Sequence, residues 1–133
     1  MQTRWKAVEA AFESMAAICQ AEHVELVVLA MPADFQIDER LLERYARLSG
    51  CRRDELDLGL PQRKLAAGAA RAGAAFIDTR PELAPLAGGA YLPDGRLLSE
   101  RAQTIVRGAL AAWIQSHLSR AIAARPTPAR STR

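Results

Sequence analysis

Apolar residues recur at steps of three and four over the first twenty positions. This spacing predicts an amphipathic helix over residues 4–21. Its apolar face consists of Trp5, Val8, Phe12, Met15 and Cys19. After His23 the pattern changes to a mainly apolar run with several β-branched residues over residues 24–30, which stops at Pro32. A run of this kind predicts a strand that is buried on both faces, as in a parallel sheet.

Capping residues predict where the next two helices begin and end. Asp38 can cap a helix that Gly50 ends, and Pro61 suits the first turn of a helix that stops at Gly73. The inner face of the first of these two helices is predicted to hold Leu41, Leu42, Tyr45 and Leu48.

The rest of the chain supplies a second strand and a last helix. Residues 74–78 form a short apolar run that ends in Asp78, and a loop rich in Pro and Gly follows over residues 80–98. Ser99 can cap a final helix. The apolar side of that helix holds Ile105, Val106, Leu110, Trp113, Ile114 and Leu118.

Two strands separated by helices predict parallel pairing with right-handed crossovers, and hence an α/β fold. Sheets usually have more than two strands, and a two-stranded sheet leaves both of its outer edges unpaired. We therefore expect further strands to come from another chain, or this chain to be the back part of a larger domain.

Charge and composition narrow the class of protein. The formal net charge is +3, but three arginines lie in residues 125–133, so residues 1–124 carry 15 basic and 15 acidic side chains. A neutral body argues against a nucleic-acid-binding surface. We expect one domain over residues 1–124 and a disordered basic tail over residues 125–133.

The sequence gives no sign of a metal, a cofactor or a membrane anchor. Cys19 and Cys51 do not have a metal-binding spacing; Cys19 is expected in the core and Cys51 in a turn. No apolar run reaches the roughly 18 residues of a membrane span, and the first residues do not read as a secretory signal. The compartment is therefore open, with the cytoplasm as the default expectation.

One segment has the pattern of a catalytic dyad. Residues 91–99 place Asp94 in a Gly-containing loop just before the C-terminal helix. The His that should follow two or three residues later is absent, because these positions hold Arg96 and Leu97. Neither side chain can act as a general base near neutral pH. The simpler interpretation of Asp94 is a turn residue, since Pro-Asp-Gly favours turns.

Four segments together resemble the C-terminal part of the SGNH/GDSL hydrolase superfamily. They are ELVVLAMP with the polar ADFQID, DLGLPQRKLAAGAARAG, AAFIDTRPEL, and YLPDGRLLSERAQTIVRGALAAWI. The resemblance covers roughly residues 5–118. It implies a partial three-layer α/β/α fold, flavodoxin-like, with a parallel sheet and the front half missing.

The resemblance carries over only in part to single residues. Asp94 matches the triad acid, and the base position falls on Arg96 or Leu97, depending on a one-residue gap. The family's nucleophilic Ser and its oxyanion Gly and Asn have no match here. His23 and His117 offer no substitute base.

We therefore expect a truncated or degenerate SGNH/GDSL-type ester hydrolase that is inactive as this chain. The complete family hydrolyses acyl esters through a Ser–His–acid triad, so an ester substrate is expected only for a complete relative. The alternative is a non-catalytic α/β interaction module that associates through its open sheet edge. The expected partners are a second copy or a missing N-terminal half, with no nucleic acid and no membrane span.

Overall fold

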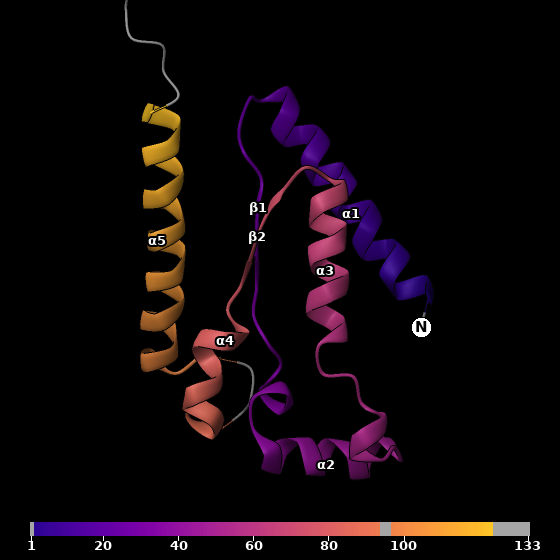
Figure 1. Cartoon of the computed structure of the whole chain (residues 1–133). Helices are drawn as coiled ribbons and strands as arrows, with labels where there is room; N and C mark the ends of the chain where they lie inside the picture. The colour runs from indigo at the N-terminus through magenta and orange to yellow at the C-terminus, as the bar shows by residue number, and fades with distance from the viewer. Residues whose placement is uncertain (1, 94–96, 124–133) are drawn as a thin grey trace, which may run out of the picture.

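The computed structural model describes residues 2–93 and 97–123 (Figure 1). Its longer elements are α1 (Gln2–Ala21), β1 (Val27–Ala30), α2 (Glu39–Ser49), α3 (Leu60–Arg71), β2 (Ala75–Asp78), α4 (Arg80–Leu83) and α5 (Glu100–Ala123). Three short 3₁₀ helices join them: η1 (Asp34–Gln36), η2 (Arg53–Glu55) and η3 (Ala84–Gly89).

The two strands are parallel neighbours, as the sequence predicted. Val27 pairs with Ala75, and the register runs to Ala30 opposite Asp78. In the described residues the sheet has these two strands alone, which fits the α/β class but not a three-layer fold. The tail over residues 125–133 lies outside the described residues.

The prediction that the first strand is buried on both faces is only partly right. Ala30 is buried, whereas the other strand residues are half-buried. A sheet of two short strands leaves both outer edges open, so its side chains keep part of their exposure.

Helices lie on both sides of the strands. Figure 1 shows α1 and α3 on one side of the sheet and α5 on the other. The ring of Phe12 in α1 lies over Gly68 of α3, where an added Cβ would sit 2.9 Å from the ring. The absence of a side chain at Gly68 thus lets the two helices approach closely.

The predicted caps are confirmed. The Asp38 carboxylate accepts hydrogen bonds from the backbone N–H groups of Arg40 and Leu41, and Gly50 ends α2 with φ 66°. Gly73 follows α3 with φ 68°, a conformation that glycine adopts without strain. The predicted inner face of α2 is partly wrong, because Leu48 is 78% exposed while Ala46 is buried.

The segment predicted as a loop over residues 80–98 contains α4 and η3, and it holds a small core. Leu83 and Ala90 are fully buried against Ala102 of α5. This core fixes the first turns of α5 beside α4 (Figure 1). Farther along α5, Ile114 and Leu118 are exposed, contrary to the predicted apolar side.

Candidate functional site

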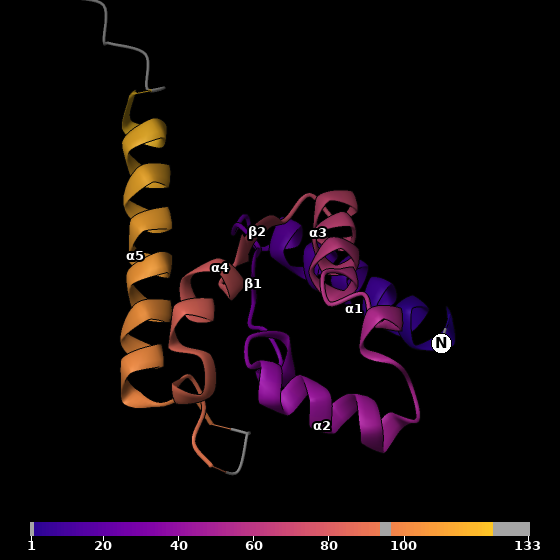
Figure 2. The same cartoon turned by 60° about the horizontal axis from the view of Figure 1, so that its bottom comes forward.

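The carboxyl ends of β1 and β2 form the edge at which parallel α/β sheets hold their ligands and catalytic groups. Thr79, which follows β2, is fully buried and donates its hydroxyl hydrogen bond to the carbonyl oxygen of Ala30, at 2.9 Å. Figure 2, turned so that this end comes forward, shows α2 crossing below the strands. The two strand ends are therefore held together, and α2 lies beyond them (Figure 2).

The described ends of the dyad-like segment, residues 91–99, are fastened to this same edge. The Tyr91 hydroxyl donates a hydrogen bond to the carbonyl oxygen of Pro32, just after β1. Tyr91 and Leu98 form an antiparallel bridge, and the Leu92 N–H donates to the Leu97 carbonyl oxygen at 2.8 Å. Both described ends of the turn are thus paired with each other.

Asp94 and Arg96 lie outside the described residues, between these paired ends. Leu97, the other position matched to the family's base, is 59% exposed. Ser99 caps α5, as predicted: its Oγ accepts from the Ala102 N–H at 3.3 Å and donates to the Gly89 carbonyl oxygen at 2.7 Å. This Ser is therefore engaged as a cap rather than placed as a nucleophile.

A cavity of about 440 Å³ lies beside the loop at the carboxyl edge. Its lining residues are Asp34, Asp38, Arg40, Leu41, Arg44, Gly88, Tyr91, Leu92 and Pro93. We call it the carboxyl-edge cavity. The lining mixes acid and base and adds one phenol, but no described imidazole or thiol.

Asp38 is the buried acid of this cavity. Burial pushes the pKa of its carboxyl upward, but hydrogen bonds from Arg40 and Leu41 outweigh it and hold the pKa below its usual range. The loop packs tightly against this acid, since a Cβ at Gly88 would lie 2.5 Å from Asp38 Oδ2. Asp38 is therefore an ionised cap with fixed surroundings, and it is not poised to exchange a proton near neutral pH.

Tyr91 is held as a hydrogen-bond donor. Burial and, secondly, the nearby Asp34 carboxylate raise the pKa of its phenol. A raised pKa keeps the hydroxyl protonated, which suits its bond to Pro32. Sequence reasoning missed this tether, and the tyrosine at the start of the dyad-like segment was the only sign of it.

The two histidines lie at the opposite edge of the strands. His23 follows α1 and has φ 55°, and His117 contacts Glu25, just ahead of β1, with Nε2 2.7 Å from Oε2. The His117 ring also stacks on Trp113, with centroids 4.9 Å apart. Within the described ranges, no imidazole reaches the carboxyl edge.

Asp78, the acid that ends β2, has a local role. Its Oδ1 accepts a hydrogen bond from the backbone N–H of Arg80 at 3.0 Å, which caps the turn into α4. An Asp side chain commonly caps a turn in this way.

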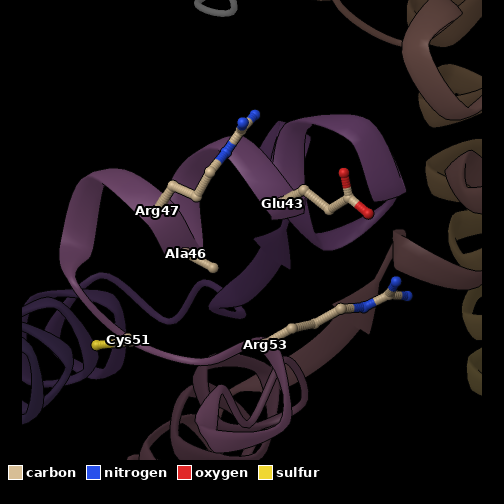
Figure 3. Close-up of a pocket in the computed structure, with 5 residues that line it drawn as sticks. All are labelled: Glu43, Ala46, Arg47, Cys51 and Arg53. Atoms are coloured by element: carbon tan, nitrogen blue, oxygen red, sulfur yellow. The ribbon is translucent and has the colours of Figure 1, made fainter.

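A different hollow, of about 340 Å³, lies along α2 and η2 (Figure 3). Glu43, Ala46, Arg47, Cys51 and Arg53 line it. Figure 3 shows the Arg47 and Arg53 side chains extending in a similar direction with their guanidinium groups well apart, whereas the Cys51 thiol lies on the opposite side. These side chains do not converge on one point, so they do not form a reacting constellation.

The described residues offer neither a metal-binding cluster nor a membrane-spanning helix. Residues 2–93 and 97–123 contain no cluster of three or more His, Cys, Asp or Glu side chains placed to hold a metal ion. None of the described helices combines the length and the apolar character needed to cross a bilayer.

Comparisons with known proteins give no relative: no family model, no curated protein and no solved structure matches this chain.

Proposed function

We propose that this chain is a degenerate SGNH/GDSL-type ester hydrolase, related to that family through the C-terminal part of a three-layer α/β/α domain. One observation carries the proposal. The turn between Pro93 and Leu97 leaves and rejoins the fold at the carboxyl edge of two parallel strands. This is the edge at which an α/β enzyme needs its acid and base.

The same geometry supports the second part of the proposal, that this chain does not hydrolyse esters. Acyl transfer by the family's route needs an imidazole within hydrogen-bond reach of a serine nucleophile. The described histidines lie at the other edge, and position 97 is an exposed leucine. An arginine at position 96 stays protonated and cannot accept the proton of a serine.

The test is hydrolysis of p-nitrophenyl acetate by the purified chain. We expect wild type, Asp94→Ala and Arg96→His to release p-nitrophenol at the rate of buffer alone, because a restored imidazole would still lack a nucleophile. Release clearly above background that Asp94→Ala abolishes would overturn the proposed loss of activity.

A second candidate function, association through an open sheet edge, has its own support in β1. The carbonyl oxygens of Leu26 and Ala30 accept hydrogen bonds from the N–H groups of Ala75 in β2 and of Thr79 just after it. The alternate residues Val27 and Leu29 therefore turn their backbone groups the other way. No described segment bonds to those outward groups.

The two outer edges of the sheet differ in how they are protected. Every side chain of β1 is apolar, whereas β2 ends in the carboxylate of Asp78. Charged residues on an edge strand hinder further pairing, so the unprotected edge is that of β1. Exposed Val24 and Met31 flank it. We infer that, as an interaction module, the chain would pair through β1.

A proline at position 27 tests this inference. Val27→Pro removes an outward N–H and leaves the bonds to β2 intact, as proline is tolerated at the first residue of an edge strand. We expect wild type to self-associate and Val27→Pro to sediment as a monomer in analytical ultracentrifugation. The control, Val27→Thr, keeps both the shape and the N–H, and should associate as wild type does. A monomeric wild type, or association unaffected by the proline, contradicts the inference.

A further inference from the structure

A separate hollow of about 330 Å³ lies between the start of α1, η1, α2 and the start of α3. Trp5, Phe35, Tyr45, Leu56, Leu60 and Pro61 provide most of its apolar lining. We call it the aromatic hollow. It shares no lining residue with the carboxyl-edge cavity. Its volume falls within the range of roughly 300–1,000 Å³ that is usual for small-molecule sites.

The wall of the aromatic hollow is a pair of stacked rings. Phe35 and Tyr45 lie with ring centroids 4.1 Å apart and planes inclined by 11°. Trp5 reaches the same hollow from α1 (Figure 2 shows α1, α2 and α3 on this side of the molecule). Flat rings that come from separate elements offer faces on which another ring can stack.

The polar groups at the floor of the hollow already have partners. Gln36 Nε2 donates to the Leu58 carbonyl oxygen at 2.6 Å and to Gln62 Oε1 at 2.8 Å. Gln36 Oε1 accepts from the Ala33 N–H at 2.7 Å, and Arg80 Nη1 adds a second bond to Leu58 at 3.1 Å. The floor therefore has little capacity left to bind a strongly polar ligand.

The charges at the rim are balanced within the protein. The Asp57 carboxylate pairs with the Arg63 guanidinium. Glu55 accepts a hydrogen bond from the Arg52 N–H at 2.9 Å and lies 3.9 Å from its guanidinium. A charged ligand would lose its hydration here without gaining a free counter-charge.

We propose that the aromatic hollow binds a small uncharged aromatic ring, stacked against Phe35 and Tyr45. The apolar walls, the satisfied floor and the paired rim all disfavour an ion and favour a flat neutral molecule. This site is independent of ester chemistry and of pairing at the edge of β1.

Binding can be followed by NMR at the two tryptophans of the chain, Trp5 and Trp113. A ¹⁵N-labelled sample gives one indole N–H signal for each, and the signal that disappears in the Trp113→Phe variant is that of Trp113. On titration with p-cresol we expect the Trp5 signal to shift and saturate while the Trp113 signal stays still. Benzoate and benzylammonium should bind at least about tenfold more weakly, because burying an unpaired charge is costly. Equal shifts at both tryptophans, no saturable shift at Trp5, or equal binding of the charged probes would overturn the proposal.

A matched pair of variants on α2 locates the site. Tyr45→Ala removes one stacked ring and should weaken p-cresol binding by about tenfold. Arg47→Ala changes an exposed side chain on the same helix that lines no hollow with Phe35 or Tyr45, and should leave binding unchanged. Circular dichroism checks that both variants fold. If Tyr45→Ala unfolds, Tyr45→Leu keeps the apolar bulk and should still bind more weakly. Wild-type affinity in a folded position-45 variant contradicts the assignment.

Discussion

Replacing Phe12 with alanine is expected to lower the free energy of unfolding by about 3 to 5 kcal/mol. The side chain is 7% exposed, and its ring fills the space between α1 and α3 over Gly68. Removing the ring leaves a void that two helical backbones cannot collapse to fill. Urea denaturation followed by far-ultraviolet circular dichroism measures the loss. The nearby Met15→Ala, at a 40% exposed position, should cost less than about 1 kcal/mol.

The contact itself can be isolated with a second substitution. Gly68→Ala in the wild-type protein should destabilise by about 1 to 3 kcal/mol, because its Cβ would meet the Phe12 ring at 2.9 Å. In the Phe12→Ala background the clash is gone, and the better helix propensity of alanine should stabilise by up to about 1 kcal/mol. Equal effects of Gly68→Ala in both backgrounds would show that the ring does not lie on Gly68.

Leu83→Ala is expected to cost about 2 to 5 kcal/mol. Leu83 is fully buried and joins α4 to the first turns of α5 through Ala90 and Ala102. Its loss should also loosen the loop that Tyr91 fastens to the carboxyl edge, so amide exchange at Tyr91 and Leu98 should accelerate with it. Leu92→Ala, at a 43% exposed position, is the matched control and should have a small effect. A Leu83→Ala protein as stable as that control would contradict a core at this place.

Sequence patterns predicted the elements that local chemistry specifies. Asp38, Gly50, Gly73 and Ser99 each act within one turn of a helix, so their roles can be predicted without knowing the fold. The parallel pairing of the strands also follows from local evidence, because helices separate the two apolar runs.

The features that sequence missed depend on tertiary neighbours. The position of Leu48 in the helical period fits the inner face of α2, but no element among the described residues covers it, and it stays 78% exposed. The prolines and glycines of residues 80–98 predicted a loop, yet Leu83 becomes buried against α5 and the segment folds into short helices. Burial of one leucine by a distant helix leaves no periodic signal in so short a segment.

At the candidate site, too, the local feature could be predicted from the sequence and the tertiary one could not. The dyad-like turn was recognisable from Asp94 and the residues around it, but the cavity beside the turn was not. Its walls come from η1, α2 and the residues after β2, which meet only when the strands pair. The aromatic hollow likewise joins Trp5 to Tyr45 across forty positions of sequence.

The long crossover between the two strands has a consequence for synthesis. Val27 of β1 pairs with Ala75, 48 residues further along the chain. At a translation rate of about 5 to 20 residues per second, β1 emerges roughly 2 to 10 seconds before its partner. During that interval both of its edges and its apolar side chains are open to other nascent chains. The sheet is therefore most vulnerable to misassembly on the ribosome, where a chaperone that holds extended apolar segments would raise the yield of folded protein.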